Sequence, residues 1–287
     1  MSELRYYEPT TLTEAVTFLA AHPKEARVVA GATDVLMDMR LGGRVPQYLV
    51  NINKLAYLSY IRDDDGALAL GALTRIRDLE TSALVKKRFP AIAEAAAEFG
   101  SVQVRNLATV GGNLVRAAPS AEMSPPLLAL DASVKLVGPG GERSVPLTDF
   151  FTGPGTTIMA SDEILAEIRV PKPAKGSGGA YLRHCVREAL DIAIVNVAAL
   201  VVLVDGRVQS ARIALGAVAP TAFRAKRAEA ALQGRTVDQG AVVRAARLAA
   251  EEAHPISDVR ASAEYRRAMV EVLTERALEV ARQRAKA

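Results

Sequence analysis

The sequence predicts an α+β protein built in two units, and three observations lead to this prediction. Helix-like and strand-like segments alternate from the N-terminus to about residue 170. The stretch 171–179 then has the Pro, Gly and Ser composition of a linker. Beyond it, long apolar strands are followed by helical segments, which is a different pattern. We therefore expect a first unit over residues 1–175, in two parts of about 1–55 and 56–175, and a second unit over 176–287.

In the first unit, helix signals alternate with short apolar runs. Thr11 and Glu14 have the spacing of a capping box and predict a helix over 14–22. Thr74 is placed to cap a helix over 75–85, and Pro90 suits the first turn of a helix over 90–102. The other expected elements are strands over 26–32, 48–52, 67–73 and 163–171, helices over 33–41 and 124–132, and a hairpin over 133–146.

The second unit begins with long apolar strands. Strands over 180–187 and 192–204 are followed by a hairpin turn at Val204–Arg207, which contains Asp-Gly, and by a strand that runs to Val218. Three helical stretches follow, from Ala222 to the end of the chain. We therefore expect a three-stranded sheet covered by helices.

The composition excludes several function classes. Half of the 287 residues are hydrophobic and 24% are charged, which is ordinary for a globular protein. The net charge of +4 is spread evenly, without a basic stripe that would predict nucleic-acid binding. The sequence contains no run of 18 apolar residues, so it predicts no membrane span. The N-terminal stretch MSELRYYEPT lacks the pattern of a signal peptide, and we therefore expect a cytoplasmic location.

Few residues are available for metal or acid–base chemistry. Cys185 is the only cysteine, so this chain alone cannot hold a disulfide, a Cys-rich zinc site or an iron–sulfur cluster. The three histidines show no metal-binding spacing. We therefore expect no metal site, and no catalytic acid–base pair is evident.

Two loops of small residues carry the functional signal. They are AGATD at 30–34 and TVGGN at 109–113. Loops of this kind can aim several backbone N–H groups at one point, which suits a pyrophosphate, and their glycines let a ligand approach closely. Neither loop has the spacing of a dinucleotide fingerprint or a P-loop. Together they suggest two loops closing on one dinucleotide, although a tight turn at the glycine pair and helix capping by Thr33 and Asp34 are alternatives.

Several longer runs of the chain resemble one protein family. These are YYEPTTLTEAVTFLAAHPKEARVVAGATDVLMDMR, QVRNLATVGGNLVRAAPSAEMSPPLLALDA, DEILAEIRVP and, near the C-terminus, DVRASAEYRRAMVEVLTERAL. They resemble the FAD-binding medium subunit of the xanthine dehydrogenase and carbon monoxide dehydrogenase family of molybdenum hydroxylases. The resemblance implies a two-part FAD-binding domain of the vanillyl-alcohol-oxidase/cresol-methylhydroxylase type, followed by a small C-terminal α+β domain.

The resemblance also implies a set of cofactor-binding residues. The two loops would hold the FAD pyrophosphate, and the remaining positions would lie along the rest of the cofactor. Three positions depart from the family pattern: Ala32 replaces a usual Gly, Glu122 a usual Asp, and Leu182 a Lys of some members, for which Arg183 could substitute. The implied residues are Val28, Val29, Ala30, Gly31, Ala32, Thr33, Asp34, Phe99, Gly100, Thr109, Gly111, Gly112, Asn113, Glu122, Leu165 and Arg183.

Plain structural roles remain open for some of these residues. Phe99 ends an apolar helix and could be a core residue. Glu122 could be a solvated carboxylate near a helix start, where acidic residues are favoured.

The implied function is that of an electron-transfer subunit in an oxidoreductase complex. FAD would be bound without a covalent link, because no flavin-linking His or Cys motif lies near either loop. A small partner would hold two [2Fe–2S] clusters and a large partner the molybdenum–pterin cofactor, in a dimer of heterotrimers. The electron acceptor would be NAD⁺, a quinone or O₂. A free-standing flavin-dependent oxidase or reductase is an alternative, as is a redox-silent assembly subunit.

Overall fold

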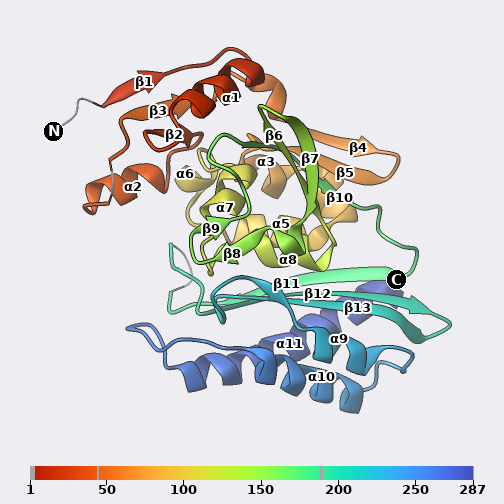
Figure 1. The fold of residues 1–287 in the computed structure, drawn as a ribbon. Helices are drawn as coiled ribbons and strands as arrows, with labels where there is room; N and C mark the ends of the chain where they lie inside the picture. The colour runs from red at the N-terminus through yellow and green to blue at the C-terminus, as the bar shows by residue number, and fades with distance from the viewer. Residues whose placement is uncertain (1–3, 44, 188–189, 287) are drawn as a thin grey trace.

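The computed structural model describes residues 4–43, 45–187 and 190–286 (Figure 1). The chain begins with a small parallel sheet in the order β1-β3-β2, with α1 packed beside it. The expected cap of α1 is confirmed, because Thr11 Oγ1 accepts the Glu14 N–H at 3.1 Å. The elements are β1 (Arg5–Tyr7), α1 (Leu12–Ala21), β2 (Ala26–Val29), α2 (Val35–Arg40) and β3 (Tyr48–Asn51).

A five-stranded antiparallel sheet follows, in the order β4-β5-β10-β6-β7, with short helices between its strands. Its strands are β4 (Ile61–Asp64), β5 (Ala67–Gly71), β6 (Ser133–Gly138), β7 (Gly141–Pro146) and β10 (Ile164–Val170). The helices are α3 (Ile76–Thr81), α4 (Ala83–Arg88), α5 (Pro90–Ala97), α6 (Val102–Arg105), α7 (Val110–Arg116) and α8 (Ser124–Ala129). The 3₁₀ turns η1 (Ala56–Leu58) and η2 (Leu147–Asp149) and the hairpin of β8 (Phe151–Gly153) and β9 (Thr156–Thr157) complete this part.

The last part is an antiparallel sheet in the order β11-β12-β13-β14, which lies between two layers of helices (Figure 1). Helices α5 and α8 pack on one face, and α9 and α11 on the other, with α10 beside them. The strands are β11 (Ser177–His184), β12 (Val195–Val204), β13 (Arg207–Gly216) and β14 (Phe223–Arg224). The helices are α9 (Lys226–Leu232), α10 (Gln239–Glu252) and α11 (Ala263–Lys286).

One face of this last sheet belongs to the core of the preceding part. Tyr181, Ala198 and Ala214 are buried in the same cluster as Phe89, from the loop before α5, and Leu127 of α8. The opposite face packs with α9–α11 in a separate apolar cluster. Strand β12 is therefore buried on both faces over most of its length, which explains its nearly continuous hydrophobic run.

Several expected elements differ from the structure in detail. Thr74 does not cap α3; its hydroxyl instead donates to the Tyr60 carbonyl at 2.7 Å, and Arg75 is the N-cap residue. The helix expected over 90–102 ends at Ala97, because Gly100 takes a left-handed φ of +46° that a helix cannot continue through. The C-terminal sheet has a fourth strand, β14, which is too short to leave a periodic pattern.

The stretch 171–179, which has the composition of a linker, is not a linker at its C-terminal end. Strand β11 begins at Ser177, and Gly178 lies directly against the backbone of α11. A Cβ atom at residue 178 would collide with the Ala281 carbonyl oxygen. Within the described residues, no helix is long and apolar enough to cross a membrane.

We predict that Gly178→Ala lowers the free energy of unfolding by about 1–3 kcal/mol, because the added methyl group separates β11 from α11. The matched control is Gly140→Ala, in the β6–β7 turn, where no other atom lies within 4 Å of the added carbon. Urea unfolding of the two variants measures the difference. Equal midpoints for both variants would contradict the close contact of β11 with α11.

Candidate functional site: a cavity between two small-residue loops

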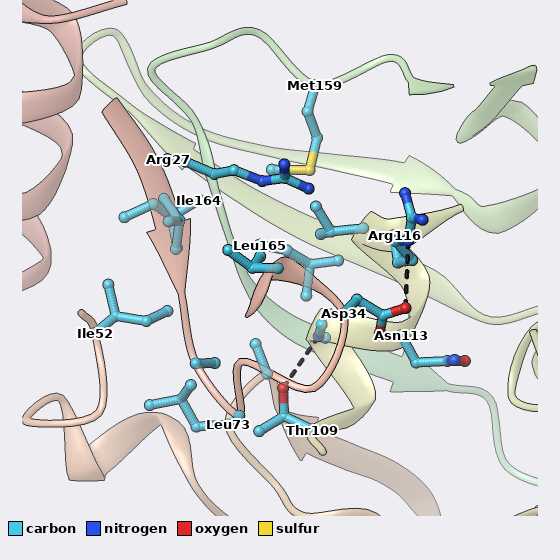
Figure 2. A pocket seen from close by; sticks show the side chains of 18 of the residues that line it. Arg27, Asp34, Ile52, Leu73, Thr109, Asn113, Arg116, Met159, Ile164 and Leu165 are labelled. Atoms are coloured by element: carbon cyan, nitrogen blue, oxygen red, sulfur yellow. Dashed lines mark hydrogen bonds and ion pairs between the residues drawn. The ribbon is translucent and has the colours of Figure 1, made fainter. Parts of the chain in front are cut away.

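A cavity of about 330 Å³ lies where the two small-residue loops meet (Figure 2). Its walls come from the end of β2, from α7, and from the segment that leads from β9 into β10. This volume is within the usual range of small-molecule sites. Most of the residues implied by the resemblance line it: Val28, Ala30, Gly31, Ala32, Thr33, Asp34, Phe99, Thr109, Gly111, Gly112, Asn113 and Leu165.

The two loops are held together by direct backbone contact. A Cβ atom at residue 31 would collide with the carbonyl oxygen of Leu107, just before the second loop. Only glycine permits this approach. The second loop is fixed in turn by Ala72, whose carbonyl oxygen accepts the Gly111 N–H at 3.0 Å.

The adjacent glycines 111 and 112 are not a turn but part of the first turn of α7. Thr109 is the N-cap residue, and its hydroxyl oxygen accepts the Gly112 N–H at 3.1 Å. A Cβ atom at residue 111 would lie 2.7 Å from the Ala72 carbonyl oxygen, so Gly111 is needed for packing. At residue 112 the nearest atom would be the Thr109 hydroxyl oxygen at 2.9 Å, and φ is not positive. Gly112 is therefore the glycine of this pair that leaves space in the cavity.

The loop after β2 differs from the second loop in its unused hydrogen-bond donors. Among the described residues, no acceptor takes the backbone N–H groups of 31–34. Buried or half-buried amides without partners are rare in folded proteins. The second loop is the opposite case, since its N–H groups at 110–113 all donate within the chain. Within the two loops, the backbone donors without an acceptor among the described residues therefore include those of 31–34 and that of Thr109.

Asp34 does not act as the helix cap that its position suggests. It occupies the N-cap position of α2, but its side chain makes no capping hydrogen bond. Its carboxylate instead lies 3.3 Å from Nε of Arg116, at the end of α7 (Figure 2). Ala32, two residues earlier, has a left-handed φ of +59°, which a glycine would adopt without strain.

Four of the implied residues do not line the cavity. Val29 is buried in β2, and Gly100 forms the corner after α5. That corner is held by Arg105, which donates to the Phe99 carbonyl oxygen at 3.0 Å. The other two, Glu122 and Arg183, lie close to each other beyond Asn113. Phe99 belongs to the apolar core, as one of its expected roles required, and it also lines the cavity.

Glu122 and Arg183 are largely buried and form a charged cluster with the half-exposed Glu98. The Arg183 side chain is only 2% exposed, and its Nη2 lies 3.1 Å from Glu98 Oε2. Its Nη1 lies 3.6 Å from Glu122 Oε1. Burial raises the pKa of Glu122 to about 7, an effect that outweighs the opposing attraction of Arg183. Glu122 is therefore not the solvated carboxylate that was one of its two expected roles.

Other lining residues carry no signal in the small-residue motifs. Ile52, Leu73, Met159 and Ile164 supply apolar walls from four separate segments, which only the fold brings together (Figure 2). Arg27 and Arg116 are the cationic lining residues. Arg116 could have been found by periodicity, since it lies one helical turn after Gly112 once α7 is known to begin at Val110.

We predict that Glu122→Gln stabilises the protein relative to wild type, and more at pH 8 than at pH 5. Between pH 4.5, the ordinary pKa of a glutamate, and pH about 7, the folded protein keeps Glu122 protonated while the unfolded chain does not. The free energy of unfolding of the wild type therefore falls as the pH rises through this range. Glutamine has no proton to lose, and the difference should grow by about 1–3 kcal/mol. Denaturant unfolding at several pH values measures it, with the exposed Glu264→Gln as control. A pH-independent difference would argue against a buried, proton-binding Glu122.

Comparisons with known proteins place this fold and cavity in a family. Residues 2–173 match the family described as the FAD binding domain in molybdopterin dehydrogenase. Residues 180–281 match the family described as the CO dehydrogenase flavoprotein C-terminal domain.

Relatives of known name align over nearly their whole length. The carbon monoxide dehydrogenase medium chain of Hydrogenophaga pseudoflava is 35% identical over 276 residues, covering 96% of both chains. The putative xanthine dehydrogenase FAD-binding subunit of Escherichia coli (strain K12) is 32% identical, covering 95% of this chain and 94% of the relative.

Solved structures agree with these relatives. A structure of carbon monoxide dehydrogenase from Hydrogenophaga pseudoflava superposes with a TM-score of 0.95 at 36% identity, covering 98% of both chains. Quinoline 2-oxidoreductase from Pseudomonas putida 86 gives a TM-score of 0.92 at 32% identity, covering 99% of both chains. This chain therefore belongs to the FAD-binding subunits of the molybdenum hydroxylases, a family of oxidoreductase subunits that includes the carbon monoxide dehydrogenase medium chains and the xanthine dehydrogenase FAD-binding subunits.

Proposed function

We propose that this chain binds one FAD non-covalently in the cavity between the two loops and passes electrons from a partner subunit to an external acceptor. The observation that carries the proposal is the set of backbone N–H groups at 31–34, which have no acceptor among the described residues and border the cavity. Amides arranged in this way suit a diphosphate. The membership of the FAD-binding family supports the choice of FAD over other diphosphates.

Each part of the cavity would have its own task in holding the cofactor. The amides of residues 31–34 would bind the pyrophosphate. Thr109 uses its hydroxyl oxygen to accept from Gly112, so its hydroxyl proton can donate to the ligand. Asn113 uses Oδ1 to accept the Met123 N–H at 3.3 Å, which leaves its NH₂ group to donate. The apolar side chains of Ile52, Leu73, Met159, Ile164 and Leu165 would exclude water.

We further propose that Glu122 and Arg183 act at the end of the cofactor near Asn113. Glu122 is coupled to the cavity electrostatically, because the charge of Asp34 adds to the rise of its pKa. In its protonated form it would donate a hydrogen bond to a cofactor hydroxyl or carbonyl group. Arg183 would supply a fixed positive charge, which is already balanced by Glu98. When bound, FAD would accept electrons and pass them on to a second acceptor.

The electrons would come from a different chain. Iron–sulfur clusters are held mainly by cysteine thiolates, and this sequence has one cysteine, Cys185. The relatives named medium chains belong to enzymes of several chains. One related structure is named for lacking the Mo-pyranopterin moiety of its molybdenum cofactor. We therefore propose a small [2Fe–2S] partner and a large molybdopterin partner in a dimer of heterotrimers, with NAD⁺, a quinone or O₂ as acceptor.

We predict that the purified chain carries one FAD that acid precipitation releases fully into the supernatant. Flavin colour that remains in the precipitated protein would contradict a non-covalent link. The FAD of the isolated chain should be reduced by dithionite but not by carbon monoxide, xanthine or aldehydes, because their oxidation would occur on the large partner. Direct reduction by such a substrate, without partners, would favour the alternative of a free-standing flavin-dependent oxidase or reductase.

We predict that Gly112→Val abolishes FAD binding while the fold survives. The added Cβ atom would meet the Thr109 hydroxyl oxygen at 2.9 Å, and the side chain would occupy cavity space. Circular dichroism should stay near wild type while the flavin absorbance is lost. The comparison variant, Gly111→Val, should instead lose stability, because its side chain collides with Ala72. Stoichiometric FAD in Gly112→Val would remove residue 112 from the site.

A further inference from the structure

Two carboxylates stand beside the loop that is proposed to bind the diphosphate. Asp34 ends this loop, and Asp38 follows one turn later in α2. The carboxylate of Asp34 is half exposed, and that of Asp38 is partly buried. Close to a doubly negative ligand, both would oppose binding, since like charges a few ångströms apart repel strongly near a protein surface. The cavity therefore needs positive charge that balances them.

Arg116 supplies this balance from the opposite side of the cavity. Its Nε lies 3.3 Å from Asp34 Oδ1, and its Nη2 lies 3.1 Å from Asp38 Oδ1. The second oxygen of Asp38 lies 3.4 Å from Nη2 of Arg27, on β2. The network thus contains two carboxylates and two guanidinium groups and is neutral overall. Figure 2 shows the Arg116 side chain directed at Asp34 from α7.

The same ion pairs provide a mechanical connection. Helix α2 has no buried residue, so apolar packing contributes little to its position. Leu36 and Met37 are about half exposed, and Met39 is partly buried. Arg116 connects both Asp34 and Asp38 to α7, whose other end carries the second loop. A two-carboxylate pairing of this kind holds a segment better than an isolated surface ion pair.

We propose that Arg116 is a positioning residue that neutralises Asp34 and Asp38 and holds the 30–34 loop against α7, so that the cavity accepts a diphosphate. This inference rests on the proposed function, because it concerns the same cavity. Arg116 acts through the two carboxylates and not by contacting the ligand. Removing Arg116 should therefore weaken ligand binding less when Asp34 is absent. It should also weaken the binding of a charged ligand more than that of an uncharged one.

The test is a double-mutant cycle on FAD affinity. The apo forms of wild type, Arg116→Gln, Asp34→Asn and the double variant are titrated with FAD, with flavin fluorescence as the readout. We expect Arg116→Gln to raise the Kd for FAD at least tenfold. The double variant should recover at least threefold of this loss, because the charge of Asp34 is gone, while the charge of Asp38 remains and the contact between the loop and α7 is still absent. Riboflavin, which has no phosphate, should show a change of less than threefold in Arg116→Gln. The control is Arg227→Gln, which removes a similar ion pair, with Glu251, outside the cavity lining.

Each contrary result has a distinct meaning. An unchanged Kd in Arg116→Gln, or a loss that Asp34→Asn does not reduce, overturns the inference while the proposed function stands. An equal loss for riboflavin and FAD also overturns it, because the effect would then be general damage to the cavity. Thermal melts of the apo variants monitor folding independently of the ligand. If wild type itself binds no FAD, the proposed function fails and the inference fails with it.

Discussion

The cavity depends on one close contact between two backbones. Gly31 lies against the carbonyl group of Leu107, so the loop after β2 and the segment before α7 touch without side chains between them. The second segment is attached to the central sheet by backbone hydrogen bonds, from Gly111 to Ala72 and from Val110 to Thr74. The parallel N-terminal sheet and the five-stranded sheet are thereby fixed relative to each other. The cavity is the space that remains on one side of this junction.

A second junction, with the C-terminal sheet, contains buried polar groups. Among the described residues, the Ser124 hydroxyl and Nε of Arg183 are buried there without a hydrogen-bond partner. Each such group costs free energy, and natural proteins contain few of them. They lie in the same region as Tyr181 and Glu122, where burial and, to a lesser degree, the charge of Glu122 raise the pKa of Tyr181. Buried polar groups of this kind lower the free energy of unfolding. In exchange, they favour one fixed arrangement of the charged side chains at this junction.

The two acidic neighbours of Arg183 stand in different environments. Glu98 Oε2 lies 3.1 Å from the guanidinium group, and the Glu98 side chain is half exposed. Glu122 Oε1 lies 3.6 Å from the guanidinium group and is almost fully buried, and burial raises the pKa of Glu122 to about 7. Glu122 therefore gains or loses its proton near neutral pH. This property follows from the burial of its side chain rather than from its sequence context.

Much of the fold was predictable from the sequence, because its signals are local. The cap at Thr11, the Asp205-Gly206 hairpin and the long apolar strands each follow from a few adjacent residues. Twelve of the sixteen residues implied by the family resemblance line the cavity, mainly through the two loops. The roles within these loops were not predictable. Gly111 serves packing against Ala72 and Gly112 leaves cavity space, a difference that depends on a strand far away in the sequence. Arg116 and Met159 likewise reach the cavity only through tertiary structure.

Ala32 shows that the loop after β2 is held by its surroundings rather than by its own preference. Its left-handed φ costs about 1–2 kcal/mol for a residue with a side chain. The conformation persists because both sides are fixed, with Gly31 pressed on Leu107 and the Ala32 carbonyl oxygen accepting the Leu36 N–H at 3.1 Å. Asp34, at the end of the loop, is tied to Arg116. A loop that is fixed on both sides keeps in place, before a ligand arrives, the N–H groups that have no acceptor in the described part of the chain. Binding then does not have to order the backbone, so more of the interaction energy remains as affinity.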